Sequence, residues 1–448
     1  MIIHWKRTES VLFTFLIVIC PCFILIIKQS FHSSRGPVIV ENVIRTFNGT
    51  KTYTPSAESD NCGSNLVLLR QLEEIAKKRK VPDIDCSAIF SANEEKLKEA
   101  VNIAKASRGG LKSAFYLNAT QSCQDFQKSR GYVTSSLTSE EGNFPLAFSL
   151  ILYADLEMAE RLLRAVYRPQ NVYCLHVDRK VSVNYLKAIT AVAACFPNVF
   201  ISSKRVNVVW GKFSVLKAEL ICMEELWQYS SWKYFINLAG QEFPLRTNLE
   251  LVRILKAFNG ANSVSGRIKK NDERRWSNAP PLSGIQPVKG SVHIVVNRHY
   301  VDFILHTKAA LKLLKWTKRT RVPDETFFPT LNFNPQLSIN GSYSGSPNEI
   351  QQSINRYKIW YTQELCAGRL RRGICILSTG DLPRLGQSKH LFANKFLIHE
   401  DSVVIGCLEE KLANETRDEY ACRKMFDATW YSRLDFVQKQ IRTYGDNV

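Results

Sequence analysis

The stretch LAFSLILY, residues 146–153, decides the fold of this chain. An uninterrupted apolar run of strand length is typical of a strand that is buried on both faces of a parallel sheet. A helical pattern of apolar positions follows over residues 156–166, and a second apolar run, residues 172–177, ends in Asp178. Strand, helix and strand in this order predict a βαβ unit.

The same alternation continues along the chain. We expect further helices at residues 183–195, 214–228, 248–259 and 300–316, and further strands at 198–202, 233–238, 292–297 and 371–377. Ligands of such sheets bind at the carboxyl ends of the strands, so Asp178 is a candidate for holding a ribose hydroxyl, with a helix N-cap as the alternative. Since no GxGxxG motif follows the first strand, the sequence argues against a dinucleotide-binding domain.

A second informative stretch is RVPDETFF, residues 321–328. Pro323 has no N–H to donate and is expected to hold Val322 extended, so a helix should begin here. Asp324 and Glu325 would then lie in the first turn, where the helix dipole favours negative charge. Two interpretations fit this pattern: both carboxylates cap a surface helix, or one of them points into a cleft as a general base.

The N-terminus indicates the compartment. Lys6 and Arg7 precede an uncharged apolar run, residues 11–27, which is near the shorter limit for crossing a bilayer. No small-residue cleavage site follows it, which favours a signal anchor over a cleaved signal peptide. With the positive charge mostly on the N-terminal side, we predict a cytoplasmic tail (1–10), a transmembrane signal anchor (11–27), a luminal stem (28–85) and a luminal catalytic domain (86–448). A helical patch at residues 66–79 is either ordered or part of a self-associating stem.

The sequons and cysteines agree with a luminal address. N-glycosylation motifs occur at Asn48, Asn118, Asn340 and Asn414. Ten of the twelve cysteines lie beyond the apolar run, where an oxidising lumen favours disulfides. The alternative is a metal site, but no CxxC pair occurs and no histidine has ligand spacing from a cysteine.

The net charge is +19, with a pI near 9.4. Nucleic acid is not expected as a partner of a luminal protein that has no nucleic-acid motif. The excess of Lys and Arg suits an anionic small ligand, such as a nucleotide diphosphate, or acidic glycans. Arg371, Arg372 and Lys395 are candidates for holding a diphosphate, although lone surface cations are commonly just solvated.

Six motifs in this order make the chain similar to a known family. It resembles the core 2 and I-branching β-1,6-N-acetylglucosaminyltransferases, the family 14 glycosyltransferases of the Golgi, from about Cys86 to Cys407. The motifs are RLLRAVYRPQNVYCLHVD (161–178), CFPNVFISSK (195–204), WKYFINLAGQEFPLRTNLELV (232–252), PDE (323–325), RGICILSTGDL (372–382) and HLFANKF (390–396).

The resemblance implies a GT-A-type α/β fold, a Rossmann-like mixed sheet flanked by helices. It implies transfer of N-acetylglucosamine (GlcNAc) from UDP-GlcNAc to a sugar hydroxyl with inversion and without a metal. The sequence agrees with the last point, since its one DxD pattern, Asp83-Ile-Asp85, lies before the catalytic fold.

Residue roles follow from the same resemblance. Glu325 would be the base that deprotonates the acceptor's 6-hydroxyl, and Arg372 and Lys395 would neutralise the UDP pyrophosphate in place of a metal. The remaining implied donor contacts are Ile151, Tyr153, Asp178 and the site-wall residue Trp210.

The departures from the family pattern fall mainly on the acceptor side. Ser265 stands where core 2 enzymes carry a glutamate, and Asp272 stands where they carry a lysine, while Arg275 is retained. Trp360 completes the implied acceptor residues. Two further differences are Val322 in place of a serine and Glu242 in place of an aspartate. The donor half thus matches the family and the acceptor half is altered, which leaves core 2 acceptor specificity open.

The family's cystine pattern implies four disulfides: Cys86–Cys407, Cys123–Cys195, Cys174–Cys222 and Cys366–Cys375. Cys62 and Cys422 are left over. They either pair with each other, or Cys62 links two copies of the chain into a homodimer.

The leading hypothesis is a type II Golgi membrane enzyme that transfers GlcNAc from UDP-GlcNAc, in β-1,6 linkage, to galactose or GalNAc of O-glycans or related glycans. One alternative within enzymes is a transferase that uses another UDP-sugar. A different class of protein, a UDP- and glycan-binding Golgi protein that has lost turnover, is favoured by Ser265 and Asp272 but not by Glu325.

Overall fold

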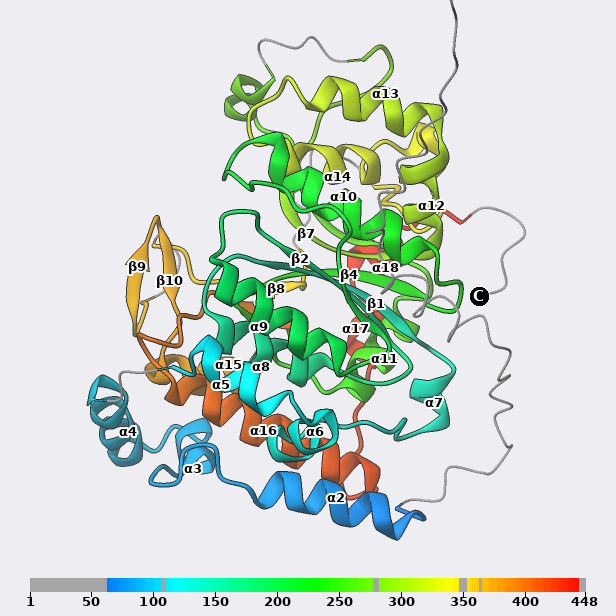
Figure 1. The fold of residues 1–448 in the computed structure, drawn as a ribbon. Coiled ribbons are helices and arrows are strands. Elements are labelled where there is room, and N and C mark those ends of the chain that lie inside the picture. Colours follow the sequence, from blue (N-terminus) through cyan, green and yellow to red (C-terminus); the bar gives the residue numbers. More distant parts are fainter. Residues whose placement is uncertain (1–62, 107–109, 277–281, 346–352, 362–364, 443–448) are drawn as a thin grey trace, which may run out of the picture. The chain divides into compact units, whose positions relative to one another are not determined.

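A six-stranded sheet forms the centre of the computed structural model (Figure 1), which describes residues 63–106, 110–276, 282–345, 353–361 and 365–442. The strand order is β3-β2-β1-β4-β7-β6; the first four strands run parallel, and β7 runs antiparallel to both β4 and β6. The bounds are β1 Leu146–Leu152, β2 Val172–Val177, β3 Val199–Ile201, β4 Tyr234–Ala239, β6 Ser263–Arg267 and β7 Lys289–Asn297. This mixed sheet with flanking helices confirms the predicted α/β fold class.

Two hydrophobic cores lie on opposite faces of the sheet. On one face Phe148, Leu150 and Leu152 of β1 pack with α8 (Leu156–Val166), α9 (Val183–Ala194) and α11 (Asn248–Ala257). On the other face Ala147 packs with α10 (Phe213–Trp227), α12 (Arg298–His306), α13 (Lys308–Thr317) and α14 (Asp324–Asn332). Because successive side chains of a strand point to opposite faces, the unbroken apolar run of β1 supplies both cores.

The helix predicted at residues 300–316 is wrong in one respect: it is two helices, α12 and α13. Thr307 separates them, with an extended backbone at φ −98° and ψ 143°. Its side-chain oxygen accepts a hydrogen bond from Ala310 N, 3.2 Å away, and so caps α13. A threonine inside an amphipathic pattern thus ends one helix and starts the next.

The strand predicted at residues 371–377 is confirmed only over residues 374–376, which form β10. The segment is the second half of a hairpin that joins β9 (Arg369–Arg371) to β10 (Ile374–Ile376). Arg372 and Gly373 form its turn, with φ of 55° and 80°. Two central residues at positive φ are the pattern of the tight hairpin turns, in which glycine is favoured. Arg372 is therefore at the tip of a hairpin.

Two features of the sheets were not predicted from the sequence: the second sheet and strand β6. A second, three-stranded sheet has the order β5-β11-β8, with β5 Glu242–Pro244, β11 Phe392–Asn394 and β8 Arg356–Tyr357. In the main sheet, β6 carries no apolar run that would have predicted a strand, and α14 lies against it. A Cβ on Gly266 would come within 2.3 Å of the Phe333 ring, and one on Gly290 within 2.5 Å of Pro329. These glycines allow α14 to approach the β6–β7 pair closely.

Part of the predicted stem packs on the catalytic domain. Helix α2 (Leu66–Lys77) buries Leu68 and Leu72 against Val133 and against Tyr420 of α16 (Val403–Tyr420). The helical patch is therefore ordered. The other helices are α3 Cys86–Phe90, α4 Glu94–Ala106, α5 Ser113–Ala119, α6 Cys123–Arg130, α7 Ser139–Gly142, α15 Leu382–Gln387, α17 Thr429–Ser432 and α18 Asp435–Gln438, with 3₁₀ turns η1 Lys270–Arg275, η2 Pro335–Leu337 and η3 Thr379–Asp381.

The four implied disulfides are confirmed: Cys86–Cys407, Cys123–Cys195, Cys174–Cys222 and Cys366–Cys375. The first joins α3 to α16 across 321 residues of sequence, a long loop whose closure restricts the unfolded chain strongly. Cys422 is also disulfide-bonded, and its partner lies outside the described residues. The prediction for Cys62 falls outside them as well.

The predicted tail and anchor, residues 1–27, and the sequon at Asn48 lie outside the described residues. Among the helices in the described part of the chain, none combines the length and apolar character that a bilayer span needs. Of the remaining sequons, Asn118 is exposed on α5, whereas Asn340 and Asn414 are half-buried. Asn118 is thus the most accessible acceptor for a glycan.

Glu219 of α10 is buried under the sheet and gives the fold a specific pH dependence. Its Oε2 accepts a hydrogen bond from Ser149 Oγ at 2.8 Å, and burial raises its pKa to about 8 from the ordinary 4.5. Between these two values the folded chain keeps a proton that the unfolded chain has lost. The free energy of unfolding therefore falls as pH rises through this window, by up to about 1.4 kcal/mol per pH unit.

Glu219→Gln is expected to remove this component of the pH dependence, because the amide does not titrate. Urea unfolding of both proteins at pH 5, 6.5 and 8 measures the difference in slope. Parallel stability curves for wild type and variant would contradict the assignment.

Candidate active site

Asp178 follows directly after β2 and lies beside the carboxyl end of the neighbouring strand β1. Asp178 N donates to Leu152 O at 2.7 Å, one residue beyond Ile151. The carboxylate is buried and accepts from Lys180 N at 2.8 Å, while Lys180 Nζ lies 3.1 Å away. Ser182, not Asp178, caps α9, so the N-cap alternative for Asp178 is wrong. A carboxylate fixed in this way at a strand end can accept hydrogen bonds from ribose hydroxyls.

Tyr153 connects the end of β1 with the second sheet. Its hydroxyl donates to Gln241 Oε1 at 3.0 Å, and its ring is half-exposed. Gln241 O in turn accepts from Phe396 N at 2.9 Å. The end of β1 is thus one residue, Gln241, away from the segment that carries Lys395.

Lys395 and the hairpin arginines form a group of cations. Leu377 N donates to Lys395 O at 2.9 Å, which ties the strand after the hairpin tip to the lysine. Burial lowers the pKa of Lys395, and the charges of Arg371 and Arg372 lower it further. The three side chains are therefore close enough to repel one another, and a bound anion would relieve this repulsion.

Glu242 holds the second sheet together. Its buried carboxylate accepts from Arg356 Nε at 2.7 Å and from Asn394 Nδ2 at 2.9 Å. Because β8 and β11 run parallel, with Arg356 opposite Phe392, the chain leaves both strands at the same edge. That edge carries Lys358 and Lys395.

Glu325 lies among cations on α14. Its Oε2 is 2.9 Å from Arg275 Nη1 and 3.9 Å from Lys289 Nζ, and the side chain is half-buried. Lys358 is near enough for the charge of Glu325 to act on it, although burial dominates and lowers the pKa of Lys358 to about 8. Lys358, at the edge of the second sheet, and the carboxylate on α14 therefore face one region.

The interpretation that both carboxylates cap a surface helix is wrong. No side-chain hydrogen bond caps the start of α14. Asp324 is buried and its Oδ1 has no hydrogen-bond partner; burial, and then the charge of Glu325, raise its pKa to about 7. Two carboxylates that are adjacent in sequence thus have different surroundings, and only Glu325 is ion-paired with Arg275.

Val322 does not have the extended conformation that Pro323 predicts. Its φ is 51°, and its carbonyl accepts from Glu325 N at 3.1 Å. Positive φ at a β-branched residue costs about 1–3 kcal/mol and is found where the surrounding structure imposes it. A Cβ on Gly211 would lie 3.9 Å from Val322 Cγ2, so the loop that carries the exposed Trp210 runs beside the start of α14.

The four predicted acceptor residues differ in their surroundings. Arg275 reaches the candidate base and its carbonyl accepts from Arg321 N at 2.7 Å. Ser265 lies at an irregularity of β6, opposite β7. Asp272 is buried and accepts from Arg267 Nε and Nη2 at 3.2 and 3.4 Å, so its carboxylate is already engaged. Trp360 is partly exposed and bridges to Ile374 of the hairpin.

Sequence reasoning missed Lys289, Lys358 and Gln241. A signal for Lys358 was present, because Arg356, Lys358 and Trp360 alternate with Tyr357 and Ile359 in a strand-like pattern. Lys289 precedes the predicted strand 292–297, and nothing in its sequence neighbourhood points to Glu325. For metals, no group of three or more His, Cys, Asp or Glu side chains in the described ranges is arranged to hold an ion.

The comparisons with known proteins show the family of the chain. The sequence profile of the Core-2/I-Branching enzyme matches residues 146–386. The chain is 34% identical over 383 residues to a Homo sapiens beta-1,3-galactosyl-O-glycosyl-glycoprotein beta-1,6-N-acetylglucosaminyltransferase, with 78% of this chain and 89% of the relative covered. It is 35% identical over 382 residues to the type 3 enzyme of that name from Rattus norvegicus, covering 78% and 86%.

A viral relative of the same name, from Bovine herpesvirus 4, is 36% identical over 365 residues, covering 74% of this chain and 83% of its own. The matched range includes the ends of β1 and β2, α14 and the β9–β10 hairpin, and it ends before Lys395. The chain belongs to the Core-2/I-branching enzyme family.

Proposed function

We propose that this chain transfers GlcNAc from UDP-GlcNAc, with inversion and in β-1,6 linkage, to galactose or GalNAc of a glycoprotein glycan. The observation that carries the proposal is the position of Glu325 in one region with Arg275 and Lys358, next to the edge that bears Lys395. The names of the relatives support the reaction class.

In the proposed reaction Glu325 takes the proton of the acceptor's 6-hydroxyl as that oxygen bonds to the anomeric carbon. The bond from the anomeric carbon to the UDP oxygen breaks on the opposite face, and its electron pair leaves with UDP. Lys395 and Arg372 neutralise the charge that develops on the pyrophosphate, which is the work a divalent metal does in many related reactions. Asp178 and Tyr153, at the ends of β2 and β1, are the proposed contacts of the uridine half, with Ile151 and Trp210 beside them.

On the acceptor side we propose a glycan different from that of the relatives. Asp272 is occupied by Arg267, and Ser265 offers a hydroxyl where a carboxylate is expected from the family pattern. These two positions also support the second candidate, a UDP- and glycan-binding protein without turnover. A site built to bind a sugar hydroxyl loses much of its discrimination when its polar partner is missing.

We further propose a Golgi membrane location through a single N-terminal anchor at residues 11–27, with the catalytic domain luminal. The luminal address is supported by the four disulfides, which persist in oxidising compartments. Two proposals remain for Cys62: it pairs with Cys422 within one chain, or it links two copies into a homodimer, and non-reducing electrophoresis of wild type and Cys62→Ser distinguishes them.

Transfer from UDP-GlcNAc is expected to continue at an unchanged rate in excess EDTA, because fixed cations take the place of a metal. The measurement uses radiolabelled donor and a panel of galactose- and GalNAc-terminated acceptors, with other UDP-sugars as a second arm. Loss of transfer on chelation, restored by Mn²⁺, would contradict metal independence. UDP binding without transfer to any acceptor would favour the second candidate.

A further inference from the structure

A cavity of about 70 Å³ lies between α2, α8 and α16, and no residue of the candidate active site lines it. A site for one water needs about 10–15 Å³ by this measure, so the cavity has room for a polyatomic ion with several waters. One wall is apolar. The cavity is lined by Leu72, Ile75, Lys80, Arg130, Gly131, Val133, Arg164, Ala165, Arg168, Glu409, Leu412, Ala413 and Thr416. We call it the cationic cavity.

Positive charge exceeds negative charge in this lining: four cations face a single carboxylate, Glu409. That carboxylate is already paired with Arg161 at 2.6 Å and with Arg164 at 2.5 Å, and although burial opposes ionisation, these arginines lower its pKa to about 2. Arg130 is paired with the buried Glu160 at 2.5 Å. The nearby carboxylates are thus used by three arginines, Arg130, Arg161 and Arg164.

Among the described residues, Lys80 of the cavity has no ion pair and Arg168 has only a loose one. Lys80 forms no ion pair with a carboxylate of the described residues, and its pKa falls to about 8 because of burial and then the charge of Arg164. Arg168 is only 4% exposed; its Nη1 donates to Tyr167 O at 2.7 Å, and its Nε, which has no hydrogen bond, forms a loose ion pair with Glu141 Oε1 at 3.8 Å. A buried cation without a close partner is costly, so it marks a place where an anion is stabilised.

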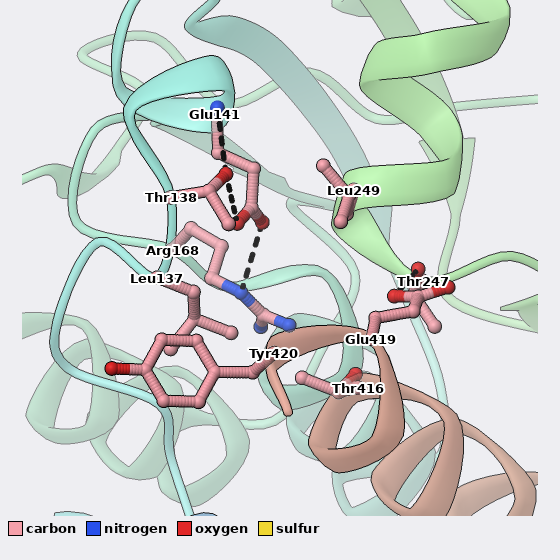
Figure 2. A pocket seen from close by; sticks show the side chains of 9 residues that line it. All are labelled: Leu137, Thr138, Glu141, Arg168, Thr247, Leu249, Thr416, Glu419 and Tyr420. Carbon is pink, nitrogen blue, oxygen red and sulfur yellow. Dashed lines mark hydrogen bonds and ion pairs between the residues drawn. The ribbon is translucent and has the colours of Figure 1, made fainter. Parts of the chain in front are cut away.

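Arg168 also lines a smaller cavity of about 10 Å³, which shares Thr416 with the first. Figure 2 shows the guanidinium between Glu141 and Tyr420, with Glu419 and Thr247 on the far side. This smaller space is about large enough for one water, and two atoms beside it, Arg168 Nε and Glu419 Oε1, have no hydrogen bond. It does not supply a counter-charge for Lys80, so the charge imbalance of the larger cavity remains.

We propose that the cationic cavity binds a tetrahedral oxyanion, phosphate or sulfate, through the ammonium of Lys80, with the guanidinium groups of Arg164 and Arg168 adding positive charge beside it. Planar guanidinium groups and an ammonium around one space suit the several acceptor oxygens of such an ion. The bound ion would join the segment after α2 to α8 and the loop that follows it. Its consequence is a stabilised contact between the predicted stem and the catalytic domain, independent of the proposed transfer reaction.

The test is the thermal midpoint of the full-length chain in 0–20 mM phosphate or sulfate, with chloride at matched ionic strength as reference. The variant is Lys80→Gln, and the matched control is Lys77→Gln, an exposed lysine at the end of α2. We expect phosphate and sulfate to raise the wild-type and Lys77→Gln midpoints by about 2 °C or more, saturably, and the variant to need at least about tenfold more anion.

Without oxyanion, Lys80→Gln should melt above wild type, because it removes a buried ammonium that Arg164 repels. If Lys80 only formed stabilising contacts, Lys80→Gln would melt below wild type instead. Equal shifts in all three proteins, or an equal shift in chloride, would reduce the effect to general salt stabilisation and overturn the proposal. A shift that disappears in Lys395→Gln would overturn it as well, because the ion would then occupy the proposed diphosphate site.

Discussion

Glu325→Gln is expected to lower kcat for GlcNAc transfer by about 10³-fold, with UDP binding unchanged. General-base catalysis contributes on the order of 10²–10⁴-fold, and glutamine keeps the shape of the side chain but does not take up the acceptor's proton. The amide oxygen can still reach Arg275, which lies 2.9 Å from the wild-type carboxylate, so the surroundings of the site are retained. Initial rates at saturating donor and acceptor measure the loss.

The neighbouring carboxylate provides the control. Asp324→Asn removes an acid from the same helix turn, but this side chain is buried, with a pKa raised to about 7 by burial and by the charge of Glu325. We expect it to keep transfer within about tenfold of wild type, as a residue outside the reacting groups should. Equal losses in the two variants, with unchanged thermal midpoints, would remove Glu325 from the role of base.

Lys395→Gln is expected to lower kcat by about 10²–10³-fold, the usual effect of removing one group that stabilises developing charge. Lys395 is half-buried and fixed by its backbone bond to Leu377, whereas Arg372 is on an exposed hairpin tip. A partly buried, positioned charge acts more strongly than a solvated one, so we expect Arg372→Gln to have the smaller effect. Single-turnover rates with UDP-GlcNAc measure both.

A donor with a less basic leaving group separates this role from simple binding. If Lys395 stabilises the departing diphosphate, its replacement should matter several-fold less with such a donor, because less charge stabilisation is needed. Lys389→Gln is the matched control: an exposed lysine six residues earlier, whose Nζ lies 4.5 Å from the Trp430 ring centroid. A uniform rise in donor KM at constant kcat would indicate that Lys395 only binds the donor.

The sequence by itself determined the framework. The apolar runs that became β1 and β2, the amphipathic helix between them and the proline before α14 are local signals. Each depends only on residues that are close in sequence: the strands on a continuous apolar run, the helix on its 3.6-residue periodicity, and the start of α14 on the missing N–H of Pro323. The resemblance to the family added the cystine pairs and the candidate roles of Glu325, Lys395 and Arg372. Long motifs in a fixed order identify a family, whereas the spacing of single residues does not.

The tertiary structure alone decided which charges meet. Lys358 and Glu325 lie far apart in sequence, and Asp272 is paired with Arg267, which the sequence of η1 does not indicate. The tight turn at Arg372 and the positive φ of Val322 also depend on packing: local preference makes Val322 extended, but α14 and the Gly211 loop override it. Periodicity fixes which face of an element is apolar, whereas the approach of side chains from distant segments is fixed only when the cores on both faces of the sheet are filled.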